Sequence, residues 1–184
     1  MSYRTRRLYF VFLGTCLLMS LVSPSAAHVQ EKNDPNDASG PLDLKSASFS
    51  HPRRKIRSTL TTRGDWTAGT LDDGSALKFA YDSRGNGFGD FYVEVKAAPE
   101  GGLRGSLYRG SDALAGGGEF VTNVSASRSG HTLVVKFRKR RLDPRNNYIG
   151  WSAQSEYRGT MACADRKFGC FDVMPDGTFY RHDI

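Results

Sequence analysis

Residues 77–95, LKFAYDSRGNGFGDFYVEV, decide the fold class of this chain. Every second residue is large and apolar in 77–81 and again in 91–95, and the segment between them, 82–90, holds three glycines. Such alternation places one face of an extended segment against a core and the other toward solvent. Glycine supplies the positive φ angles that tight turns require. The stretch therefore predicts an antiparallel β-hairpin.

The same alternation recurs on both sides of this hairpin. The predicted strands span residues 42–50, 55–66, 77–81, 91–95, 103–109, 120–127, 133–137, 149–153, 170–174 and 178–181. A change of parity between Leu44 and Ala47 indicates a β-bulge in the first strand. The chain has 20 glycines, and no window of the sequence carries the helical i, i+3, i+4, i+7 pattern. We therefore expect an all-β fold, an antiparallel two-sheet sandwich or a jelly-roll-like arrangement.

The first 27 residues have the composition of a secretory signal. Three arginines precede an apolar run at 8–22, and residues 25–27 are small, as a signal peptidase requires. We expect cleavage near Ala27 and a secreted, extracellular protein. A transmembrane anchor would need about 20 apolar residues, and Cys16 fits an ordinary apolar-region cysteine better than a lipidated one. The adjacent arginines at 6–7 leave the choice between general secretion and twin-arginine export open.

Removal of this signal leaves one domain with a small positive charge. Without the three leader arginines the net charge falls from +7 to about +4, too little to argue for a nucleic-acid partner. Residues 28–41 are polar and predict a disordered leader. Residues 42–184 have the size of one β-sandwich domain with one core, which we expect to be a monomer that does not span a membrane.

Cys163 and Cys170 are the two cysteines outside the signal. In an oxidising compartment such a pair forms a disulfide, and closing so short a loop stabilises the fold by roughly 2–3 kcal/mol. The spacing excludes a C-x2-C metal knuckle, and no further cysteine or nearby histidine pair completes a zinc site.

The sequence lacks the motifs of common catalytic sites. H-E-x-x-H, G-x-S-x-G and the phosphate-binding glycine loop are all missing. His51, His131 and His182 each lie beside turn or terminal residues, where a histidine is usually solvated or caps a turn. We therefore predict no catalytic residue and no cofactor. The alternative is a secreted hydrolase whose site is assembled only in space.

The segment 82–90 matches a calcium-binding loop only in part. Asp82 and Asp90 occupy ligand positions of the template, but Arg84 places a cation where a carboxylate is wanted, and Val93 stands at the bidentate position. We predict a glycine-rich turn without a metal ion.

The mature chain resembles a group of uncharacterised secreted β-sandwich proteins of actinobacteria. The resemblance rests on the acidic leader and first strand at 37–44, the hairpin tip at 82–90, the cysteine segment at 163–172 and the terminal His-Asp-Ile at 182–184. That group has no assigned activity, so the resemblance implies a secreted β domain and no particular chemistry.

Two kinds of surface could bind a ligand. Trp66, expected at a sheet end, and Tyr92, opposite in parity to its apolar neighbours, could stack on sugar rings, whereas Trp151 is in step with core residues. Arg138 and Arg140 belong to one of two basic runs, 53–57 and 136–141.

Charge runs usually mark a solvated face. If both runs lie on one sheet, they would form a patch for anionic envelope polymers or lipid headgroups. We therefore predict a non-catalytic binding module for an extracellular carbohydrate or cell-envelope polymer, with Trp66, Tyr92, Arg138 and Arg140 as contact residues.

Overall fold

The computed structural model describes residues 28–110, 117–164 and 169–184, and most regular structure in these ranges is β-strand. The strands are β1 (Val29–Asn33), β2 (Leu44–Ser50), β3 (Lys55–Thr62), β4 (Ala76–Asp82), β5 (Phe91–Ala97), β6 (Leu103–Arg109), β7 (Glu119–Ser129), β8 (Thr132–Arg138), β9 (Tyr148–Tyr157), β10 (Cys170–Met174) and β11 (Tyr180–Asp183). The helical segments are α1 (Met161–Ala164) and the 3-10 turns η1 (Ala68–Leu71) and η2 (Lys139–Arg141). All ten predicted strands are present, which confirms the all-β prediction.

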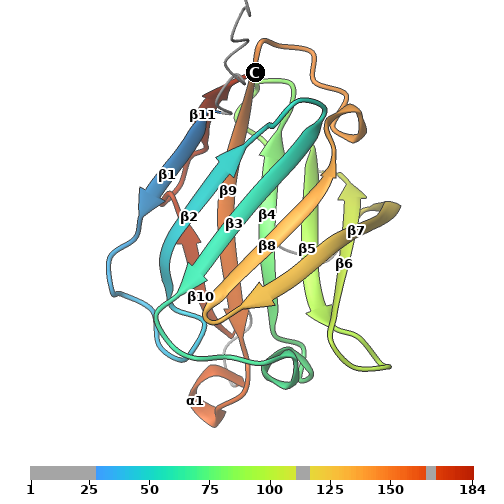
Figure 1. Cartoon of the computed structure of the whole chain (residues 1–184). Coiled ribbons are helices and arrows are strands. Elements are labelled where there is room, and N and C mark those ends of the chain that lie inside the picture. Colours follow the sequence, from blue (N-terminus) through green and yellow to red (C-terminus); the bar gives the residue numbers. More distant parts are fainter. Residues whose placement is uncertain (1–27, 111–116, 165–168) are drawn as a thin grey trace, which may run out of the picture.

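The described strands form one continuous antiparallel sheet. Their order is β1-β2-β3-β8-β7-β6-β5-β4-β9-β10, with β11 paired to β9. β7 joins the two halves, because its residues up to Val124 pair with β6 and those from Ser125 onward pair with β8. The sheet curls there so that its halves face each other (Figure 1). The finer prediction of two separate sheets, as in a sandwich or jelly roll, is not confirmed.

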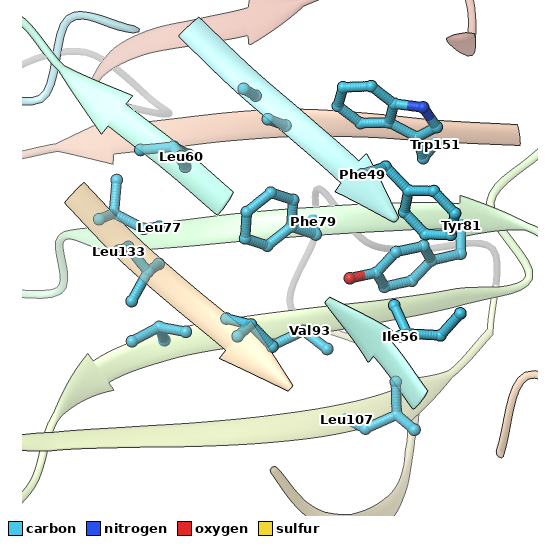
Figure 2. Packing of buried hydrophobic residues seen from close by; sticks show 14 of the residues in the cluster. Phe49, Ile56, Leu60, Leu77, Phe79, Tyr81, Val93, Leu107, Leu133 and Trp151 are labelled. Atoms are coloured by element: carbon cyan, nitrogen blue, oxygen red, sulfur yellow. The ribbon is translucent and has the colours of Figure 1, made fainter. Parts of the chain in front are cut away.

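The hydrophobic core fills the space between the two halves of the sheet. Phe49 from β2 packs with Phe79 from β4 and Trp151 from β9, and all three are fully buried (Figure 2). Side chains alternate between the two faces of a strand, and the alternating apolar residues of β3, β4, β5, β8 and β9 line the inner face of the sheet. Tyr81 also lies in this core, where its hydroxyl is hydrogen-bonded to that of Ser58 at 2.9 Å.

β1 corrects the prediction that residues 28–41 form a disordered leader. It pairs with β2 along its whole length. The curled sheet is open between β1 and β11, which we call the seam, and the Gln30 side chain crosses it. Gln30 Nε2 donates to the Arg181 carbonyl at 2.9 Å, and Gln30 Oε1 accepts from Trp151 Nε1 at 2.7 Å. The strand was missed because Val29 is its only large apolar residue.

Four other predictions concern individual features of the chain. The predicted bulge is confirmed, since the register of β2 against β3 shifts between Leu44 and Ser46. Cys163 and Cys170 form the predicted disulfide. No helix in the described ranges is long and apolar enough to cross a membrane. The predicted signal sequence, 1–27, lies outside the described residues.

Candidate functional site

The two basic runs meet at one end of the curled sheet. β3 begins at Lys55 opposite Arg138, the last residue of β8, because the two strands are antiparallel partners. The next residue, Lys139, donates its backbone N–H to the Arg54 carbonyl at 2.9 Å. Arg53 sits in the preceding turn with a φ of 56°. Strand pairing thus brings together cations that are far apart in the sequence.

A hollow of about 660 Å³ lies among these side chains, and we call it the basic hollow. It is lined by Arg53, Arg54, Lys55, Arg138, Lys139, Arg140 and Pro144. Within the described part of the chain, none of its six cations takes part in an ion pair. Like charges gathered in one hollow raise the local positive potential and attract anions.

Trp66 does not offer an exposed ring to a sugar. The side chain is 1% exposed and belongs to the core, and its Nε1 donates to the His131 carbonyl at 3.2 Å. The Arg128 guanidinium lies 5.2 Å from the ring centroid. The chain turns after β3 and tucks the indole beneath the β7–β8 turn, so the prediction that Trp66 stacks on a ligand is wrong.

Tyr92 faces away from the core, as its parity indicated, but it is 2% exposed. Its ring stacks on Tyr108 at a centroid distance of 4.9 Å, and its hydroxyl donates to the Gly117 carbonyl at 2.8 Å. Gly118 approaches so closely that an added Cβ would lie 3.0 Å from the Tyr92 ring. The predicted ligand-binding role of Tyr92 is therefore wrong, because this outer face is covered.

A second hollow, which we call the aromatic groove, lies on the outer face of β4, β9 and β10. It measures about 280 Å³, and its lining includes Phe88, Phe171, Phe179 and Gln154. Phe88 is 69% exposed, whereas Gln154 is 8% exposed and its Oε1 has no hydrogen-bond partner among the described residues. Nothing in the sequence pattern indicates this groove, because Phe88 lies in a turn, Phe171 and Phe179 lie in two separate predicted strands, and only the fold brings them together.

Three histidines gather at the seam between β1 and β11. His182 Nε2 lies 2.9 Å from His51 Nδ1, and the His28 ring centroid lies 5.1 Å from that of His182. His182 is 1% exposed, so of the two roles expected for a histidine at such a position, solvated or capping a turn, the solvated one does not apply. Burial, reinforced by His51 and His28, lowers the pKa of His182 to about 4. His131 is exposed and lies outside this group.

Four aspartates cluster where β1 and β2 meet β10. The carboxylate oxygens of Asp34, Asp37, Asp43 and Asp172 lie within 4.8 Å of one another. Burial and then the neighbouring carboxylates raise the pKa of Asp34 to about 7, and burial raises that of Asp172 to about 6. Arg63 Nε, 3.1 Å from Asp43 Oδ2, offsets part of this negative charge. Such oxygens are the donors that a hard cation prefers, but proximity alone does not establish a site.

The carboxylates of the hairpin tip are engaged within the tip itself. Asp82 accepts the backbone N–H groups of Gly85 at 2.6 Å and Gly87 at 2.8 Å, and Asp90 pairs with Arg84 at 3.4 Å. Asp82 therefore shapes a glycine-rich turn, in the role that its sequence position suggested. That calcium plays no part here stays a prediction.

Comparison with known proteins adds little to this description. No family model matches the chain, and no curated protein matches it with significant similarity. Among solved structures, the chain is similar to a Bacteroides uniformis protein described as a "putative carbohydrate-binding protein", with a TM-score of 0.40 and 12% identity over 80% of this chain and 76% of that one. A likeness this weak does not identify a function.

Proposed function

We propose that this protein is a secreted, non-catalytic binding protein whose basic hollow binds an anionic glycan or cell-envelope polymer. The observation that supports the proposal is the group of six unpaired cations around one hollow, among the residues that the structure describes. Holding like charges together is unfavourable unless an anion offsets their repulsion. A ligand with several negative groups would offset the repulsion among several of these cations at once.

The lining residues suit carboxylate, sulfate or phosphate groups. Arginine presents a planar fork that pairs with such groups through two parallel hydrogen bonds, and lysine adds a compact point charge. A hollow of about 660 Å³ is in the range of small-ligand sites. The hollow would therefore contact a short charged segment of a longer polymer.

Charge reversal tests this proposal. Arg138 is exposed at the rim, so Arg138→Glu should preserve the fold and weaken binding to polygalacturonate about tenfold, with Arg140→Glu acting alike. Arg104→Glu, an equally exposed reversal on β6, is the matched control and should change the affinity less than twofold. Equal weakening by the control, or equal binding to neutral dextran, would contradict the proposal. Release of reducing ends during incubation would instead favour the secreted hydrolase.

A second candidate function is binding of a neutral sugar in the aromatic groove. It is supported by the Oε1 of Gln154, which is nearly buried, has no hydrogen-bond partner in the described ranges and lies in a groove lined by three phenylalanine rings. Aromatic faces stack on the apolar side of a pyranose, while a polar atom bonds its hydroxyls. Such binding would be insensitive to salt.

A matched pair of phenylalanine variants separates this candidate from non-specific adhesion. Phe88→Ala should reduce binding to neutral oligosaccharides about tenfold, whereas Phe120→Ala, which removes another exposed ring at 54% exposure on β7, should leave it unchanged. Equal effects of the two substitutions would exclude the aromatic groove.

A further inference from the structure

Strand pairing brings three histidines from separate parts of the chain to one point. His28 precedes β1 and His51 follows β2, and these strands are antiparallel partners, so both residues lie at the same end of the pair. His182 lies on β11, which the Gln30 to Arg181 hydrogen bond holds against β1 (Figure 1). The cluster thus closes one end of the seam in the curled sheet.

The nitrogen atoms of His51 and His182 are spaced for a shared metal ion. Two ligand nitrogens, each about 2.0 Å from a metal ion and at right angles, lie about 2.8 Å apart. His51 Nδ1 and His182 Nε2 are 2.9 Å apart. Without an ion, one ring donates an N–H to the other. When the donor ring changes tautomer, so that its proton sits on its other nitrogen, both facing nitrogens present lone pairs and can act as ligands.

The surroundings hold the His182 ring in one orientation. The ring is 1% exposed and meets the edge of Phe49 at a centroid distance of 4.8 Å. A ligand side chain that packing already fixes in place is preorganised for a metal ion.

His28 is placed to add two more nitrogen atoms. Cleavage after Ala27, predicted from the small residues at 25–27, would make His28 the first residue of the secreted chain. The α-amine and the Nδ1 of a first-position histidine can chelate one ion. The His28 side chain is exposed, and its ring centroid is 5.1 Å from that of His182, so His28 lies beside the pair and would have to rotate to join it.

We propose that His28, His51 and His182, together with the α-amine of His28, form a binding site for a divalent transition metal ion, with Cu(II) bound most tightly. Imidazole and amine donors suit copper, nickel and zinc, and the affinity of such donors for divalent ions is greatest for Cu(II). This site is separate in chemistry from the proposed polymer binding, and either can fail without the other.

Copper titration of the secreted protein tests the site. The full chain is secreted from a bacterial host, its first residue is identified by mass spectrometry, and Cu(II) alone is titrated against a chromophoric chelator. We expect one ion per chain, at least tenfold weaker binding in His28→Ala and His51→Ala, and unchanged binding in the control His131→Ala. Nitrogen couplings in the electron paramagnetic resonance spectrum should diminish in His51→Ala.

Two outcomes would overturn the inference. Equal copper affinity of His51→Ala and His131→Ala, with both variants folded by circular dichroism, would exclude the histidine cluster as the site. Insertion of Gly-Ser between Ala27 and His28 removes the α-amine from the cluster and should weaken binding about tenfold without abolishing it. An unchanged affinity in that variant would exclude the amine as a ligand. His182 is not substituted, because its burial makes loss of folding the expected result.

Discussion

Lys78 is a buried cation on the outer face of β4. It is 4% exposed, and its Nζ lies 3.2 Å from Glu156 Oε2 and 3.7 Å from Glu94 Oε1. Lys78→Met would remove the shared partner of two nearly buried carboxylates, which keep their more exposed cations, Arg158 and Lys96. We expect a loss of about 2 kcal/mol in the free energy of unfolding, measured by urea denaturation.

The control for this prediction is Lys96→Met. Lys96 also pairs with Glu94, at 3.1 Å, but its side chain is 38% exposed, and exposed pairs contribute about 1 kcal/mol or less. Equal losses of unfolding free energy in the two variants would show that the burial of Lys78 does not strengthen its ion pairs.

Asp34 makes the stability of the protein depend on pH. Burial and the neighbouring carboxylates raise its pKa in the folded state to about 7 from the ordinary 3.8. A raised pKa means that the native state holds the proton more tightly, so the contribution is complete below about pH 4 and is lost as the pH rises toward 7. Asp34→Asn should therefore match the wild type at pH 4 and melt a few degrees higher at pH 7.5.

Solvent reduces the effect of Asp34 on stability, because the side chain is only partly buried. We therefore expect Asp34→Asn to raise the free energy of unfolding at pH 7.5 by about 1 kcal/mol. Asp72→Asn, a substitution at an exposed position on the turn after η1, serves as the control. Melting curves of Asp34→Asn that parallel the wild type from pH 4 to 7.5 would refute the account.

Sequence parity predicted the faces of single residues better than their exposure. Trp151 lies in the core, as its step with apolar neighbours indicated, and Tyr92 points outward as its parity required. The exposure of Tyr92 depends on Gly117 and Gly118, which pack over it from another part of the chain. Alternation along one strand carries no information about such cover.

At the scale of elements, Gln30 joins β1 to the far half of the sheet. Its Oε1 accepts the only side-chain N–H of Trp151, at 2.7 Å, and its Nε2 bonds β11. Gln30→Ala leaves the buried indole N–H unpaired, which should cost about 1–2 kcal/mol and lower the melting temperature by several degrees. Glu31→Ala, on the exposed face of β1, should change it little. Equal melting temperatures for Gln30→Ala and Glu31→Ala would show that the hydrogen bonds of Gln30 across the seam do not stabilise the fold.

The elements differ in how well the sequence predicted them. Strands with one buried face were found from alternation, because burial forces every second residue to be apolar. β1 was missed since an edge strand with mostly exposed side chains needs no such pattern. The basic hollow depended on whether the runs at 53–57 and 136–141 fall on paired strands, and the pairing of β3 with β8 is non-local.

For the whole molecule, neither the net charge nor the all-β fold class indicates where the cations gather or how the strands are arranged. A net charge of about +4 without the predicted leader is modest, yet six cations surround one hollow. Likewise, alternation specified an antiparallel β fold, but the single curled sheet follows from the length of β7, which pairs with both halves. These properties arise from three-dimensional assembly.

The salt dependence of polymer binding tests the central claim most directly. Exposed charges are screened over about 8 Å at physiological ionic strength and over about 3 Å at 1 M, so binding through the basic hollow must weaken as salt rises. We predict that the affinity for polygalacturonate falls more than tenfold between 0.05 and 0.5 M NaCl, and that the Arg138→Glu, Arg140→Glu double variant shows a much shallower fall. An affinity that salt leaves unchanged, or an equal fall in the double variant, would contradict the account.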